Sequence, residues 1–199
     1  MSALNAIYFT LAAIVLLGSP GPGIAALIAV GRSRGLWGGM RFYLGLQLGL
    51  AIAAGASGAG LASVLRAVPV VGPAMTVAAT GYLIWLAYRI ASAPVGFPVA
   101  EAGTGASSAR GGFALGVTNP KSYIAFASLM ASYPIFAFEP QADVATKWGL
   151  CVAVMVVVDL AWLAFGVLIG RAQFSPVSER RLNLAMGATI LATAVLAVI

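Results

Sequence analysis

One acidic residue, Asp159, stands in the middle of a long apolar segment. Residues 150–170 are rich in Val, Leu, Ala and Phe, and Asp159 is their only charged side chain. A carboxylate at the centre of a bilayer costs roughly 2.5–3.5 kcal/mol on insertion scales, so such acids usually face a protein interior or a water-filled path. There the group can hold or exchange a proton. Asp159 is therefore our first candidate for proton or ion coupling.

Two short segments combine proline with strongly polar groups. Residues 19–23 read Ser-Pro-Gly-Pro-Gly, and residues 118–121 read Thr-Asn-Pro-Lys. Each proline removes a backbone donor and interrupts a helix. Irregular backbone at membrane depth is tolerated only where protein or a wet cavity surrounds it. Both segments are therefore predicted to lie inside the protein, and Lys121 brings an ammonium group to one of them.

These groups are predicted to share one level near the middle of the membrane. Pro20 lies 11 residues before Gly31, Lys121 lies 11 after Arg110, and Asp159 lies 12 before Arg171. At about 1.5 Å per helical residue these separations are roughly 16, 16 and 18 Å. Opposite charges at the same depth could offset each other's desolvation, so we expect Asp159 and Lys121 to be partners.

The composition is that of a polytopic membrane protein. Hydrophobic residues make up 61% of the 199-residue chain and charged residues only 8%, against roughly 25% charged in soluble domains. At about 20 residues per span, the chain has room for five to seven helices. We expect one membrane domain over 1–199, with N- and C-terminal halves over 1–91 and 111–199 and a polar loop over 92–110. The N-terminal apolar segment lacks a basic start and is expected to be a retained helix rather than a signal peptide.

We predict an all-α fold of six transmembrane helices, two of which are broken. Interruptions in the first and fourth helices, about one hundred residues apart, divide the chain into two three-helix halves that enter the membrane from opposite sides. This is the pattern of an inverted repeat, in which broken helices mark a transport site. The six helices are predicted at 4–31, 38–65, 70–91, 111–138, 145–170 and 182–199.

Basic residues predict the orientation of the chain. The predicted loops put nine Lys and Arg residues on one side and two, Arg66 and Lys147, on the other. The positive-inside tendency then places the nine in the cytoplasm and both termini outside. The net charge of +6 therefore reflects topology, and no nucleic-acid partner is expected.

Several kinds of site are excluded by what the sequence lacks. It contains no histidine and one cysteine, Cys151, so a tetrahedral zinc site is not expected and a Ser–His or Cys–His nucleophile pair is impossible. We expect no enzyme activity, no metal site and no cofactor. The glycine pairs 45/49 and 166/170 have the four-residue spacing of close helix packing, and such faces permit a homodimer.

The chain resembles the lysine-exporter/RhtB family of amino-acid efflux proteins. The resemblance rests on Ser-Pro-Gly-Pro-Gly at 19–23, Gly-Arg-Ser-Arg-Gly at 31–35, Gly-Val-Thr-Asn-Pro-Lys at 116–121 and the acid at Asp159. It covers the whole chain in length and helix order. It implies a proton-driven exporter of amino acids or their relatives in the bacterial inner membrane. One departure is Gly23, where family members usually carry Asn.

On this basis the freed backbone groups of the two breaks are predicted to hold the ammonium and carboxylate of a small-molecule substrate, with Asp159 and Lys121 coupling transport to protons. Three alternatives remain: an exporter of another solute or a metal cation, a non-transporting assembly subunit, and an intramembrane enzyme. The predicted substrate-binding residues are Ser19, Pro20, Gly21, Pro22, Gly23, Gln47, Thr118, Asn119 and Pro120.

Overall fold

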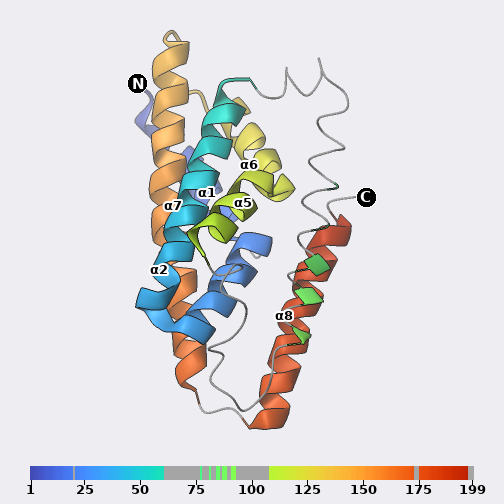
Figure 1. Ribbon diagram of the computed structural model, residues 1–199. Coiled ribbons are helices and arrows are strands. Elements are labelled where there is room, and N and C mark those ends of the chain that lie inside the picture. Colours follow the sequence, from blue (N-terminus) through green and yellow to red (C-terminus); the bar gives the residue numbers. More distant parts are fainter. Residues whose placement is uncertain are drawn as a thin grey trace.

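The computed structural model is all-helical wherever it describes the chain (Figure 1). It describes residues 1–19, 21–60, 77, 81, 84–85, 87–88, 91–92, 108–172 and 175–196. The all-α prediction is confirmed, and six helices are present in these ranges. They are α1 (Ala3–Gly18), α2 (Pro22–Gly58), α5 (Ala109–Thr118), α6 (Pro120–Ala131), α7 (Pro140–Arg171) and α8 (Pro176–Leu196). The helix predicted at 70–91 and the loop predicted at 92–110 lie mostly outside the described residues.

Prolines begin four of these helices. Pro22, Pro120, Pro140 and Pro176 are the first residues of α2, α6, α7 and α8. Proline suits this position because its φ angle is already helical and its missing N–H would have no partner inside the helix. The predicted starts at 145 and 182 were therefore wrong by five and six residues, since α7 and α8 begin at their prolines.

A single residue separates the two parts of α2. Gly35 has φ 69° and ψ −177°, whereas the residues on either side of it are helical. This left-handed φ is accessible to glycine because it has no Cβ. The predicted loop at 32–37 is thus reduced to a kink at one glycine.

The helix predicted at 111–138 is also shorter and divided. α5 ends at Thr118, Asn119 has extended backbone angles (φ −73°, ψ 105°), and α6 ends at Ala131. In the first half, α1 ends at Gly18 and the chain stays extended at Ser19 and Gly21 before α2 begins. The assignment of each helix pair to one broken membrane span, and the inverted repeat, remain predictions.

The long helices α2 and α7 lie side by side, and α5 packs against α2 (Figure 1). Glycines make these contacts close. A Cβ built on Gly31 would lie 2.2 Å from the carbonyl oxygen of Leu163 in α7, and one built on Gly166 would lie 2.4 Å from that of Ile28. The predicted packing role of the glycine pair 166/170 is confirmed, because only a missing side chain allows this approach.

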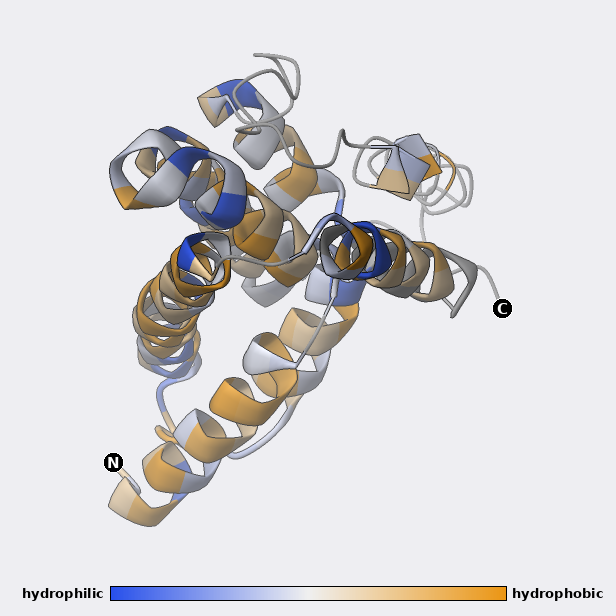
Figure 2. Cartoon of the chain, turned by 90° about the horizontal axis from the view of Figure 1, so that it is seen from below, coloured by the Kyte–Doolittle hydropathy of each residue, from blue (hydrophilic) through white to orange (hydrophobic). Residues whose placement is uncertain are grey.

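Large apolar side chains face outward on these helices. Apolar residues continue along α1 from the N-terminus (Figure 2), and Leu4, Ile7 and Val15 are more than half exposed. Within the described residues, α7 is long and apolar enough to span a membrane alone; α1 and α2, bent by 64° across residues 19–21, pass the same test as a pair.

Candidate functional site

The carbonyl groups at the end of α1 receive side-chain donors in place of helical ones. Trp162 Nε1 donates to the carbonyl of Gly18 at 3.3 Å, and Ser19 Oγ donates to that of Leu16 at 2.8 Å. These bonds matter because the last carbonyls of a helix have no partner within it. The carbonyls at the end of α1 are thus satisfied by hydrogen bonds from Trp162 in α7 and from the side chain of the C-cap residue, Ser19.

Lys121 reaches the same terminus from the first turn of α6. Its Nζ donates to the backbone carbonyl of Ser19 and, at 2.8 Å, to the Ser19 hydroxyl. The side chain passes directly over Gly21: a methyl group added there would lie 2.9 Å from Lys121 Cδ and 3.0 Å from Nζ. The two segments that were predicted to interrupt helices therefore meet through this lysine.

Asp159 is buried on α7, with 5% of its surface exposed. Its Oδ2 accepts a hydrogen bond from Gln47 Nε2 at 2.7 Å. The Oε1 atom of Gln47 is buried and receives no hydrogen bond from any described residue. Since an amide N–H₂ group donates to Asp159, this arrangement suits the ionised carboxylate.

Asn119, between α5 and α6, contributes a second buried acceptor. Its side chain is 6% exposed, and no described residue donates to its Oδ1. Leaving such an atom unsatisfied costs about 1–3 kcal/mol, so buried acceptors of this kind usually find a partner. Asn119 Oδ1 is therefore available to a ligand that carries an N–H or O–H group.

Ser19, Asn119, Lys121 and Asp159 surround one small cavity. Its volume of about 40 Å³ has room for a few water molecules and is much smaller than the roughly 300–1,000 Å³ of ordinary ligand sites. Apolar side chains from α1, α2, α6 and α7 form the remaining wall. The cavity's polar and glycine lining consists of Ser19, Gly21, Gly23, Asn119, Lys121, Ser122 and Asp159.

The structure thus brings most of the predicted site residues together. Gln47 joins them through Asp159, whereas Pro22 is buried in the first turn of α2 and Thr118 donates its hydroxyl to the carbonyl of Ala114 at 2.8 Å. Neither Pro22 nor Thr118 is among the residues lining the cavity. Pro20 and the side chain of Pro120 lie outside what the structure describes.

We expected Asp159 and Lys121 to be partners, but their hydrogen bonds within the described residues go to other groups. Lys121 donates to Ser19, and Asp159 accepts from Gln47. They line the same cavity and attract each other.

Sequence reasoning missed Trp162. This residue follows Asp159 by three positions on α7, and residues with that spacing share a helix face. The spacing could have indicated that the indole lies close to the carboxylate level. Its role here is to hold the end of α1 through Gly18.

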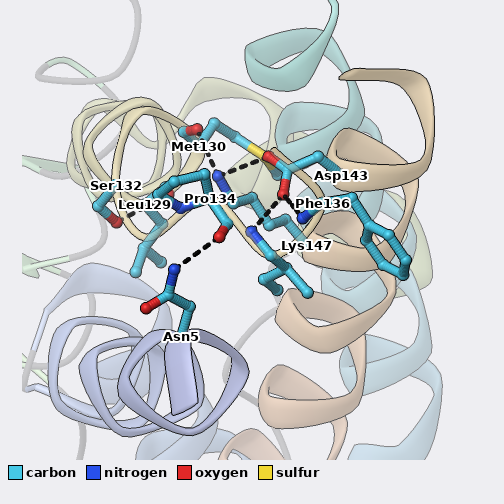
Figure 3. Close-up of polar contacts among 9 residues, drawn as sticks. Asn5, Leu129, Met130, Ser132, Pro134, Phe136, Asp143 and Lys147 are labelled. Carbon is cyan, nitrogen blue, oxygen red and sulfur yellow. Dashed lines mark hydrogen bonds and ion pairs between the residues drawn. The ribbon is translucent and has the colours of Figure 1, made fainter. Parts of the chain in front are cut away.

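A second polar cluster lies away from the cavity (Figure 3). Lys147 Nζ lies 2.8 Å from Asp143 Oδ2 and donates to the Met130 carbonyl at 3.1 Å. Asp143 Oδ1 accepts from the backbone N–H groups of Ile135 and Phe136, at 2.6 and 2.9 Å. Lys147, which we had counted among the loop charges, is only 2% exposed. It ties α7 to the last turn of α6, and Asp143 ties α7 to the chain that follows α6.

We expect Lys147→Met to destabilise the folded protein by about 1–3 kcal/mol, because it removes a charged donor from the partly buried carboxylate of Asp143 and from the Met130 carbonyl. Unfolding in detergent, followed by tryptophan fluorescence, measures this change. The double variant Asp143→Asn/Lys147→Met should recover part of the loss. A change below about 0.5 kcal/mol, typical of exposed sites, would contradict a structural role for the pair.

Within the described residues no group of three or more His, Cys, Asp or Glu side chains could hold a metal ion. The site instead offers one carboxylate, one ammonium group and neutral oxygen acceptors, lined by residues of α1, α2, α6 and α7 and by the residues that join them. This combination is typical of membrane proteins that bind a small polar solute at mid-depth.

The description LysE type translocator belongs to the family model that matches residues 14–199. The chain belongs to this family and is a membrane transporter. A search of curated proteins and a search of solved structures gave no match.

Proposed function

We propose that this transporter exports amino acids, or small metabolites resembling them, from the cytoplasm in exchange for protons. The observation that carries the proposal is that one buried carboxylate and one partly buried ammonium group line the same cavity between helix ends. A zwitterion presents the complementary pair of charges. Buried charges of this kind mark substrate and ion pathways in membrane proteins.

The substrate's two charged ends have distinct partners in the cavity. Acceptors for an ammonium group are the Ser19 carbonyl, the unsatisfied Oδ1 of Asn119 and the carboxylate of Asp159. A substrate carboxylate has the ammonium group of Lys121. Because the cavity is small in this conformation, the helices must move apart before substrate enters, as alternating access requires.

Asp159 is the proposed proton carrier. It is the charged residue of the long apolar stretch of α7, and its direct partner is the neutral amide of Gln47 rather than a fixed cation. A neutral partner leaves both protonation states accessible, because an amide can donate to the ionised form and accept from the protonated form. Proton release and substrate binding would then compete for the same cavity.

The proposed location is the bacterial inner membrane, with both termini outside; eight of the eleven basic residues lie in loops or helix ends on the cytoplasmic side, and Lys121 lines the cavity. This orientation follows the positive-inside tendency. In this membrane protons flow into the cytoplasm down their gradient, and that flow would drive the substrate outward.

Counterflow in proteoliposomes tests the proposal. Vesicles containing purified protein and one unlabelled amino acid are diluted into its labelled form, with and without a pH gradient, and the screen is repeated over the amino acids. We expect accumulation of at least one amino acid and net movement that follows the pH gradient. Transport of a divalent cation or an unrelated solute, with no amino acid moved, would contradict the proposal.

A further inference from the structure

The ammonium group of Lys121 occupies a place that suits the ammonium group of a substrate. Nζ lies against the carbonyl and hydroxyl of Ser19, just beyond the C-terminal end of the 16-residue helix α1. The C-terminal end of a helix carries a partial negative charge and favours cations. The position is thus a cation site by two independent criteria, hydrogen-bond acceptors and the field of the helix.

The backbone at Gly21 makes room for this lysine. Gly21 has an extended conformation (φ −167°, ψ −175°) that any residue can adopt. Its lack of a side chain is needed for another reason, namely that a methyl group would collide with the stem of Lys121 at 2.9 Å. Glycine at position 21 is therefore needed to make room for the Lys121 side chain and not for the backbone conformation.

The lysine and a substrate cannot share this position. With Lys121 in place the cavity measures only about 40 Å³, room for a few waters. At the same time the buried Oδ1 of Asn119, which lines the same cavity, receives no donor from any described residue. A second ammonium group could bond to Asn119, but it would have to displace Lys121 to reach the Ser19 carbonyl.

We propose that Lys121 is a tethered cation that fills the substrate's ammonium site whenever the carrier is empty. This inference rests on the proposed function and deepens it. Buried backbone carbonyls need a donor in every state of the protein. Substrate supplies that donor when the carrier is loaded, and Lys121 supplies it when the carrier returns empty.

Two modes of transport separate this role from a structural one. Counterflow exchange uses only loaded carriers, whereas net efflux requires the empty carrier to return. We expect Lys121→Met to lower net efflux by about tenfold or more relative to counterflow, a coupling of ordinary size. Equal losses in both modes would overturn the proposal.

Gly21→Ala provides an independent variant that keeps the charge. The new methyl group should push Lys121 away from Ser19 without straining the backbone, so the ratio of net efflux to counterflow should fall in the same direction. In the wild-type protein, an N-acetylated form of the transported amino acid should neither exchange nor compete, since it lacks the ammonium group. Competition by the N-acetylated form, or an unchanged ratio in Gly21→Ala, would overturn the proposal.

Lys147→Met is the matched control. It removes a buried lysine that likewise donates to a backbone carbonyl, that of Met130, but lies outside the cavity. Rates are normalised to folded protein, and its ratio of net efflux to counterflow should equal that of the wild type; a ratio lowered as in Lys121→Met would count against the proposal. Absence of amino-acid movement in both modes by the wild-type protein would instead refute the proposed function itself.

Discussion

Replacing Asp159 with Asn should reduce gradient-driven efflux to the rate of liposomes without protein. Asn fills nearly the same volume and keeps a carbonyl oxygen that can accept from Gln47, which now donates to Asp159 at 2.7 Å. Packing around α7 should therefore survive, and the protein should insert and fold. What disappears is the ionisable group, and without it no proton can be exchanged at this position. Efflux of labelled substrate from proteoliposomes under an imposed pH gradient measures the loss.

Glu139→Gln is the matched control, because it makes the same change of charge at an exposed residue at the N-terminus of α7. This variant should transport like the wild type. Wild-type efflux by Asp159→Asn would remove Asp159 from the coupling mechanism, whatever else the cavity binds. Loss of folded protein in Asp159→Asn would show that the carboxylate has a structural role that Gln47 alone does not reveal.

The position of the site was predictable because helices have a fixed rise. Counting residues from the predicted helix ends put Asp159 and Lys121 at one level, and both line the same cavity. The count needed only the 1.5 Å rise per residue and approximate ends. The error of five residues at the start of α7 did not affect the count, because the depth of Asp159 was measured from Arg171, at the other end of that helix. The depth of Lys121 was likewise measured from a basic residue, Arg110.

The contacts within the site could not be predicted in the same way. Depth says nothing about rotation around a helix axis, and the kink at Gly35 sets which face of α2 carries Gln47 toward α7. A single residue outside the helical region changes that rotation for every residue after it. Likewise Lys121 bonds to the Ser19 carbonyl rather than to Asp159 because its side chain passes over the backbone of Gly21. This contact between residues one hundred positions apart cannot be read from the sequence.

For the close contact between α2 and α5, only the glycine pair on α2 was recognised from the sequence. The pair Gly45 and Gly49 has the four-residue spacing of a packing face, and a Cβ on Gly45 would lie 2.0 Å from the Ala109 carbonyl oxygen in α5. The partner pair is Gly112 and Gly116, with the same spacing. It was overlooked because that segment also has small residues and an arginine that favour no single face.

Gly112→Ala should cause a large loss of folded protein for a single methyl addition. The new Cβ would lie 2.1 Å from the carbonyl oxygen of Phe42 and 2.9 Å from the backbone nitrogen of Leu46. Both are backbone atoms in the middle of α2, so they cannot rotate away as a side chain could. The helices must separate, at a cost of at least about 3 kcal/mol, the upper part of the usual range for overpacking.

Gly149→Ala isolates this steric effect from the general preference of helices for alanine. Gly149 lies inside α7, and a Cβ there would meet no atom within 4 Å. This substitution should leave the unfolding free energy unchanged or raise it, by up to about 1 kcal/mol. Unfolding of both variants in the same detergent, with tryptophan fluorescence as the signal, gives the comparison. Equal stability of the two variants would mean that α2 and α5 do not pack backbone to backbone, and Asn119, at the end of α5, would then lose its fixed place beside the cavity.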